Sequence, residues 1–213
     1  MKTFFRLLAF YFAIIGPGVI AALAGNDAGG ITTYSIAGAT YGYNMLWVLF
    51  FVTISLAVCQ EMSARLGVVT GKGLSDLIRE NFGIKWTAFA MLALLSANIA
   101  VIFSNFAGIA ASLEFFSISR YISVPLVGIL IWLLIVTGSY KNIERIFLAI
   151  CTLFLAYIAS GMLSNPDWGL AAVSLVKPNI VMDIDYVFMV IAIIGTTIAP
   201  WMQFFVQAMV VDK

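Results

Sequence analysis

The sequence predicts an all-α polytopic membrane protein in which two helices are broken at mid-membrane. The first observation is the composition: of 213 residues, 63% are hydrophobic and 10% are charged, with a mean hydropathy of +1.07. A soluble domain carries about 25% charged residues. The second is a series of apolar runs long enough to cross a bilayer, which takes ~20 helical residues. The third is that two of these runs, the first and the last, are interrupted near their centres by a short stretch that combines Gly with polar residues or Pro.

Six apolar runs are candidate membrane spans. We predict membrane spans at about residues 7–40, 44–66, 86–116, 122–137, 142–163 and 186–211. Residues 73–82 carry apolar side chains on one helical face and charged side chains on the other, which predicts a short helix lying at the membrane surface. Residues 164–185 are rich in Pro, Asp and Asn and predict an extracellular loop.

The positive charges predict how the spans are oriented. If the N-terminus is cytoplasmic, every Lys and Arg except Arg120 and Lys177 falls on the cytoplasmic side of the predicted spans. Cytoplasmic loops of membrane proteins carry an excess of these residues. We therefore expect a multi-pass protein with its N-terminus in the cytoplasm.

Two interruptions predict where a site lies. The first span is interrupted at residues 25–30, Gly-Asn-Asp-Ala-Gly-Gly, and the sixth at residues 195–200, Gly-Thr-Thr-Ile-Ala-Pro. Irregular backbone at bilayer depth is tolerated only where it is buried in protein or lines a wet cavity. Broken helices at corresponding positions of two five-helix units indicate a secondary transporter built from inverted repeats, with its site at the midplane. Carbonyls freed by unwinding at Gly25 and at Gly29-Gly30, together with the Asp27 carboxylate, would suit a cation.

Several motifs resemble the NRAMP family of divalent-metal transporters over nearly the whole chain. Asp27-Ala28-Gly29-Gly30 falls where the family has Asp-Pro-Gly-Asn, and Ile198-Ala199-Pro200-Trp201 takes the place of its Met-Pro-His. The run Arg65-Leu66-Gly67-Val68-Val69-Thr70-Gly71-Lys72 is similar to the loop that follows the family's second helix. The resemblance implies a LeuT-like inverted-repeat fold. Residues 1–163 would form the first five-helix repeat and residues 186–213 the first helix of the second, and further helices of the same protein would complete the cavity.

The resemblance also implies a metal site, with departures from the family pattern. The family's Asp persists as Asp27, whereas its Asn becomes Gly30 and its Met becomes Ala199. The carbonyl of Thr196 takes the position of the family's backbone ligand, and Gln203 lies one turn beyond Ala199. The residues expected to line the cavity or its gates are Asn26, Ala28, Gly29, Pro200, Trp201, Asn98 and Asn105. Loss of the thioether removes a soft ligand that favours transition metals, so the selection against Mg²⁺ is relaxed.

The third span also lacks side chains that have a functional role in the family. Three acidic residues of the family's proton route are replaced by Asn98, Asn105 and Gly108, and the sixth-span His is replaced by Trp201. Amides and indoles do not titrate in a useful range. The pattern is similar to that of the NRAMP-related magnesium transporters of prokaryotes. It implies uncoupled uptake of Mg²⁺, and also of Mn²⁺, across the prokaryotic plasma membrane.

Two other functions stay open at this point. One is proton-coupled import of Mn²⁺ or Fe²⁺, as in the parent family, and the other is sodium-coupled transport of an organic solute on the same scaffold. An enzyme is not expected, because the chain contains no histidine and no phosphate-binding Gly-Lys-Ser/Thr loop. No prosthetic group is expected, since the metal is the substrate. A net charge of +1 without a basic run gives no basis for nucleic-acid binding.

Several candidate residues also have plain structural interpretations. Asp27 could cap the helix that follows it. Asn98 and Asn105, which share one helical face, could form hydrogen bonds between helices instead of lining an ion path. Gly38 and Gly42 have the spacing of a close helix contact, and Glu61 is placed to pair with Arg65 four residues on.

Overall fold

The computed structural model describes residues 25–138, 146, 149–150, 152–181 and 183–212, and within them every regular element is a helix. In chain order these are α2 (Ala28–Tyr41), η1 (Gly42–Met45), α3 (Leu46–Thr70), α4 (Leu74–Phe82), α5 (Ile84–Glu114), α6 (Arg120–Thr137), η2 (Thr152–Phe154), α8 (Leu155–Leu163), α9 (Trp168–Val176), α10 (Ile184–Thr197) and α11 (Pro200–Val211). Residues 7–24 of the predicted first span and the start of the predicted fifth span lie outside the described residues.

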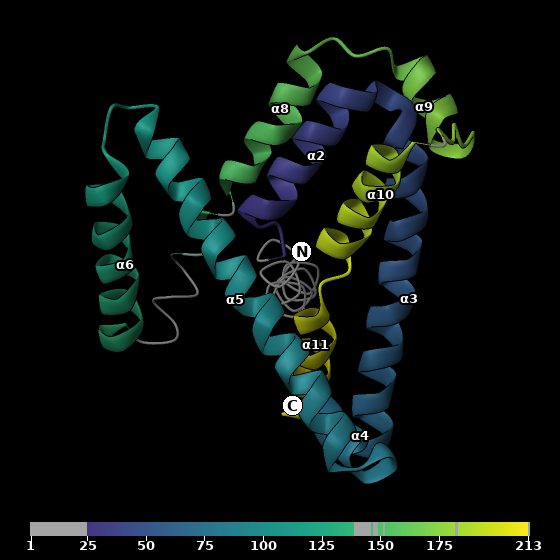
Figure 1. The fold of residues 1–213 in the computed structure, drawn as a ribbon, viewed down its shortest axis with the longest axis vertical. Helices are drawn as coiled ribbons and strands as arrows, with labels where there is room; N and C mark the ends of the chain where they lie inside the picture. Colours follow the sequence, from purple (N-terminus) through teal and green to yellow (C-terminus); the bar gives the residue numbers. More distant parts are fainter. Residues whose placement is uncertain (1–24, 139–145, 147–148, 151, 182, 213) are drawn as a thin grey trace, which may run out of the picture. The chain divides into compact units, whose positions relative to one another are not determined.

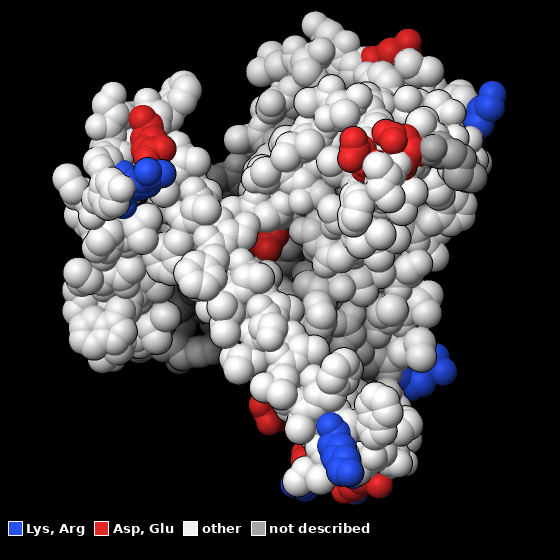
Figure 2. Space-filling model, viewed as in Figure 1, with Lys and Arg blue, Asp and Glu red and all other residues white. Residues whose placement is uncertain are grey.

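Four helical segments in the described part of the chain are long and apolar enough to cross a membrane. They are Ala28–Thr70, Ile84–Glu114, Arg120–Thr137 and Ile184–Val211. Side chains on these segments are largely exposed, and none of the residues of α5 is buried among the described residues. The face shown in Figure 2 is mostly uncharged, with Lys, Arg, Asp and Glu in small groups. This pattern is typical of a surface that faces lipid or further apolar helices.

The chain divides into two compact units. One contains residues 28–107 and 167–213, and the other contains residues 1–27 and 108–166. The second of these includes α6, η2 and α8, and its described part carries an ion pair between Arg120 and Glu114, with 4.0 Å between Nε and Oε1. The larger unit holds most of the buried residues, and it contains the interruption of the sixth span.

Helix α3 is the element on which the larger unit is built. Helix α10 lies between α2 and α3, and α11 packs against α3 and α4 (Figure 1). The core between α2, α3 and α10 is formed by Ala37, Met45, Val48, Val52, Tyr186 and Ile193. Ile193 is fully enclosed, and because lipid is as apolar as its side chain, this core is stabilised by close packing and hydrogen bonds between the helices. Both halves of the broken sixth span are therefore packed on one continuous helix.

Hydrogen bonds fix the N-terminal end of α10 to the rest of this unit. The indole Nε1 of Trp47 donates to the hydroxyl oxygen of Tyr186 at 3.1 Å, and that hydroxyl donates to the carbonyl of Asn179 at 2.8 Å. The ring of Tyr41 meets that of Tyr186 edge to face, with 5.4 Å between centroids. Because Tyr186 is only 2% exposed, its hydroxyl needs these partners.

A different contact fixes α11 to α3. A Cβ added to Gly67 would lie 3.1 Å from the carbonyl oxygen of Gln207, so the two backbones approach closely at this point. The side chain of Gln207 is fully buried, and its Nε2 donates to the carbonyl of Lys72 at 2.8 Å. The residue that permits close packing is Gly67. The spacing of Gly38 and Gly42 favoured a close helix contact there, but a Cβ added at either position meets none of the described atoms within 4 Å.

The stretch predicted as an extracellular loop contains a helix. Helix α9 begins after Asp167, whose Oδ1 accepts a hydrogen bond from the backbone N–H of Leu170 at 2.9 Å. It ends at Val176, just before Lys177 and Pro178. A capping carboxylate and a following proline are ordinary helix boundaries. The polar residues that suggested a loop are therefore the ends of a short apolar helix that packs against α3 and η1.

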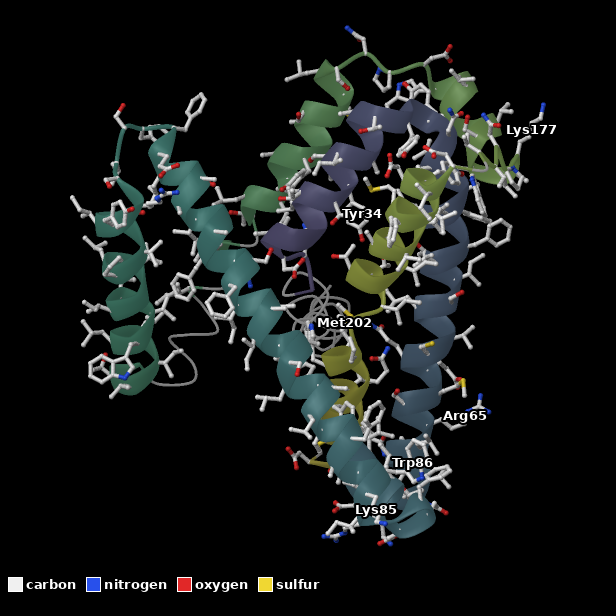
Figure 3. The ribbon with its side chains drawn as sticks, in the orientation of Figure 1. Tyr34, Arg65, Lys85, Trp86, Lys177 and Met202 are labelled. Carbon is white, nitrogen blue, oxygen red and sulfur yellow. The ribbon has the colours of Figure 1, made fainter. Side chains whose placement is uncertain are left out.

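Charged side chains mark the two ends of the larger unit. Arg65 and Lys85 lie at one end and Lys177 at the opposite end (Figure 3). The sequence-based orientation places the first two on the cytoplasmic side and the third outside, which requires such a separation. Arg65 forms the ion pair with Glu61 that their spacing favours, with 2.6 Å between Nη2 and Oε1. Both side chains are more than half exposed, so this pair contributes little to stability.

Candidate functional site

The described part of the first break consists of Gly25 to Asp27, which are not helical, and α2 begins at Ala28. The expected unwinding at Gly29 and Gly30 is wrong, because both residues lie in α2. The carbonyl of Gly29 accepts a hydrogen bond from Thr33 Oγ1 at 2.8 Å. Gly30 is buried. Glycine costs a helix only about 1 kcal/mol relative to alanine, so packing and nearby hydroxyls override its weak propensity.

Asp27 immediately precedes the first turn of α2. It is half-buried and takes part in interactions within the protein. A carboxylate at this position lies next to backbone N–H groups that have no partner within the helix, and it is favoured there by the helix dipole. Capping and cation binding both suit this position, since the carboxylate has two oxygens.

Asn105 of α5 holds the start of α2. The backbone N–H of Ala28 donates to Asn105 Oδ1 at 3.0 Å. The first N–H of a helix has no intrahelical acceptor, so a side chain from another helix satisfies it here. Of the two roles left open for Asn105, hydrogen bonding between helices is present in the structure. Asn98 lies on the same helix and is half-buried.

The second break comprises Ile198 and Ala199, between α10 and α11. Ala199 is extended, with φ −71° and ψ 136°, and Pro200 is the first residue of α11. Proline has no backbone N–H, and it disfavours helical backbone in the residue before it. The interruption is narrower than the expected residues 195–200, because Gly195, Thr196 and Thr197 complete the last turn of α10.

The Thr196 carbonyl lies in that last turn, and it lacks the usual helical donor. The residue four positions further along the chain is Pro200, which has no N–H to give. The carbonyl of Ala199, on the other side of the break, accepts a hydrogen bond from the backbone N–H of Met202 at 3.2 Å. The second break thus contains oxygen acceptors and no charged side chain.

Gln203 folds back over the start of α11. With its amide oriented to donate, its nitrogen lies 2.7 Å from the carbonyl oxygen of Ala199 and 2.9 Å from that of Pro200. The structure therefore brings Ala199, Pro200 and Gln203 together. Trp201 is half-buried and packs edge to face on Phe205, with 6.0 Å between ring centroids.

One residue next to the second break was not identified from the sequence. Tyr34 of α2 places its hydroxyl 2.8 Å from Thr197 Oγ1, directly before the break. Figure 3 shows this tyrosine projecting from α2 toward α10. Tyrosine at this position looks like ordinary apolar bulk in a span, and no local pattern identifies a partner 163 residues away.

Charge at the candidate site is sparse. Among the residues that the structure describes, no group of three or more Asp, Glu or Cys side chains is placed to hold a metal ion. Asp27 is the charged residue of the two breaks.

Comparisons with known proteins identify relatives of this chain. The family model described as natural resistance-associated macrophage protein-like matches residues 18–213. A divalent metal cation transporter MntH of Yersinia pestis is 30% identical over 195 residues, covering 88% of this chain and 47% of the relative. Proteins of the same name from Burkholderia ambifaria and Acidiphilium cryptum are 32% and 29% identical and are covered to 43%. The chain spans about half the length of the curated relatives it matches. These matches and the four apolar helices make it a multi-pass membrane protein.

Proposed function

Because the chain belongs to the natural resistance-associated macrophage protein-like (NRAMP) family, we propose that the whole protein is a secondary transporter for divalent metal ions. It takes up Mg²⁺, and also Mn²⁺, by alternating access without proton coupling. It lies in a prokaryotic plasma membrane with its N-terminus in the cytoplasm, as the distribution of positive charges favours. The names of the matched relatives, divalent metal cation transporters, support the substrate class.

The proposed metal site draws on both breaks and on further helices of the same protein. Asp27 supplies the one negative charge, and the Thr196 carbonyl supplies a neutral oxygen. Gln203 contacts the ion or its waters. Gly30 and Ala199 leave room where the family has side-chain ligands. The structure supports these two roles locally. The residue that would donate a helical hydrogen bond to the Thr196 carbonyl is Pro200, which has no N–H, and Asp27 lies directly before the start of α2.

The preference for Mg²⁺ rests on one observation, which is the absence of a donor side chain at Ala199 in the second break. A methyl group offers neither the sulfur nor the amide that would replace a water of the ion. Mg²⁺ gives up its waters reluctantly and is usually bound through one or two carboxylates while keeping several waters. A site with one acid, neutral oxygens and space suits that ion better than a site with a thioether.

The absence of proton coupling rests on the amides of α5. Asn105 accepts a hydrogen bond through its oxygen, and neither Asn98 nor Asn105 changes charge near neutral pH. A proton-coupled carrier needs groups that titrate within the membrane. With amides in place of these acids on α5, the membrane potential drives entry, since two charges that cross ~100 mV gain about 4.6 kcal/mol.

Flux into proteoliposomes tests the proposal. The full-length protein is reconstituted, and Mg²⁺ and Mn²⁺ uptake is measured at several pH gradients together with the lumenal pH. We expect saturable Mg²⁺ flux that depends on the membrane potential and not on the pH gradient. If the reconstituted protein transported Mn²⁺ but not Mg²⁺, the proposed preference for Mg²⁺ would be wrong.

The second candidate is a proton-coupled importer of Mn²⁺ or Fe²⁺. The specific observation in its favour is that the matched relatives are divalent metal cation transporters of the parent family, at 29–32% identity. In the same vesicles this function predicts that Mn²⁺ uptake acidifies the lumen. A pH indicator in the vesicle lumen therefore distinguishes the two functions.

A further inference from the structure

We propose that Tyr34 is a positioning residue of the metal site, because its hydroxyl fixes the last turn of α10 beside the second break. This inference rests on the proposed function, since Thr196 in that turn is a proposed ligand. The argument begins with the direction of two hydrogen bonds at Thr197, which follows Thr196 in the chain.

The hydroxyl of Thr197 has a single proton, and that proton is already used. Thr197 Oγ1 lies 2.6 Å from the carbonyl oxygen of Ile193, which can only accept, so the threonine donates to it. The 2.8 Å contact between Thr197 Oγ1 and the Tyr34 hydroxyl must then have the tyrosine as donor. The result is a directed chain from Tyr34 through Thr197 to Ile193. Such chains polarise and strengthen each bond.

These hydrogen bonds are important because they lie in the turn that contains the Thr196 carbonyl. The last turn of α10 lacks the hydrogen bond that would hold the Thr196 carbonyl, because Pro200 has no N–H. The backbone N–H of Ile198 still donates to the carbonyl of Ile194 at 2.9 Å, and this is the last helical bond before the break. Helix ends fray because their last carbonyls have no donor within the helix, and a tertiary contact opposes this fraying. Tyr34 supplies such a contact from α2.

Helix α2 connects the two breaks through hydrogen bonds to α5 and α10. Its first residue, Ala28, is held by Asn105 of α5, and Tyr34 lies less than two helical turns further on. At that point it holds α10. A change in the position of α2 is therefore transmitted to the last turn of α10 by the Tyr34 hydroxyl as well as by the apolar core that the two helices share. Tyr34 is thus a determinant of the site geometry without contact to the ion.

The chain offers a matched control in Tyr43. Its hydroxyl accepts a hydrogen bond from the backbone N–H of Asp167 at 3.2 Å, so it also joins distant segments, but at the start of α9. Tyr34→Phe and Tyr43→Phe each remove one phenolic oxygen and leave the ring in place. A general loss of stability would appear in both variants, whereas loss of positioning would appear in Tyr34→Phe alone.

The experiment combines transport with hydrogen exchange in the full-length protein. We expect Tyr34→Phe to raise the KM for Mg²⁺ about fivefold with little change in maximal flux, as for loss of one neutral hydrogen bond. Thr197→Val should have a similar effect, Thr197→Ser should behave as the wild type, and the double variant Tyr34→Phe/Thr197→Val should be no worse than either single variant. Amide exchange at Ile198 should accelerate in Tyr34→Phe and not in Tyr43→Phe.

The outcomes separate the inference from the function on which it rests. An unchanged KM and unchanged exchange at Ile198 in Tyr34→Phe would overturn the inference, as would equal effects of the two phenylalanine variants. If the wild-type protein carried neither Mg²⁺ nor Mn²⁺, the proposed function would fail. Exchange at Ile198 would then still decide whether Tyr34 fixes the break.

Discussion

The two breaks of this chain differ in the chemistry that they offer to a cation. The first break, Gly25 to Asp27, carries a carboxylate directly before a helix start. The second, Ile198 and Ala199, carries no charge and is bordered by carbonyl groups and the amide of Gln203. A charge controls how tightly a divalent ion is held, whereas the type and number of neutral donors control which ion is held. Under the proposed function, we therefore expect changes in the first break to alter metal affinity and changes in the second to alter metal selectivity.

The breaks also differ in how they are fixed. At the first, the amide of Asn105 accepts from the backbone of Ala28. At the second, Tyr34 reaches the side chain of Thr197, and α11 beyond the break rests on α3 at Gly67. One break is thus held by a bond to its backbone. The other is held by a side-chain contact before it and a close backbone approach after it.

Removing the charge of the first break should have the largest effect. Asp27→Ala is expected to weaken Mg²⁺ and Mn²⁺ binding by about 100-fold or more, because a hard divalent cation loses its one carboxylate ligand. Isothermal calorimetry of the purified full-length protein measures this change, and size-exclusion chromatography checks that the variant is folded and monodisperse.

A second substitution at the same position separates binding from capping. Asp27→Ser retains a side chain that caps a helix but has no charge. We expect its binding to be as weak as that of Asp27→Ala and its thermal stability to be closer to that of the wild type. Binding at wild-type strength in the serine variant would assign Asp27 to capping alone.

Adding a soft donor to the second break should change selectivity while affinity for Mg²⁺ changes less. Ala199→Met is expected to raise the preference for Mn²⁺ or Cd²⁺ over Mg²⁺ roughly tenfold, about 1.4 kcal/mol. Competition between the ions in a flux assay measures the preference. The control is Ala199→Leu, which has a similar volume and no sulfur. Equal behaviour of the two variants would mean that bulk, and not the thioether, controls selection.

Removing the amide that holds the first break should have a smaller effect. Asn105→Ala leaves the N–H of Ala28 without its acceptor in a half-buried position, which costs about 1–3 kcal/mol. We expect a lower melting temperature and a KM for Mg²⁺ that rises several-fold. Asn98→Ala on the same helix is the control and should change both quantities less. A larger effect at Asn98 would place the important amide elsewhere on α5.

The sequence predicted those features of the fold that depend on local composition. Hydrophobic length decides whether a helix spans a bilayer, so the helix expected at residues 86–116 lies at Ile84–Glu114, and the one expected at residues 122–137 lies at Arg120–Thr137. Proline decides where the second break ends, because it removes an N–H wherever it occurs. Pro200 accordingly begins α11.

The features that the sequence did not predict depend on contacts between distant residues. Gly29 and Gly30 have weak helix propensity, yet they are helical because α2 is packed against α10. Tyr34 gains its role only when α2 and α10 lie together. The metal role of Asp27 stays a prediction that the experiments above test, and the metal roles of Thr196 and Gln203 stay predictions.

The smallest expected effect concerns the close approach of α11 to α3. Alanine is a better helix former than glycine by about 1 kcal/mol, so Gly38→Ala, which meets none of the described atoms within 4 Å, should raise the thermal stability slightly. At Gly67 the added methyl would lie 3.1 Å from the Gln207 carbonyl oxygen and 3.3 Å from Val210 Cγ1. Overpacking of this kind costs about 1 kcal/mol or more, which offsets the gain in propensity. Thermal unfolding in detergent should therefore place Gly38→Ala above Gly67→Ala by a few degrees. The reverse order would show that α11 can move away from α3 at Gly67 at little cost, so that this close approach does not fix the second break.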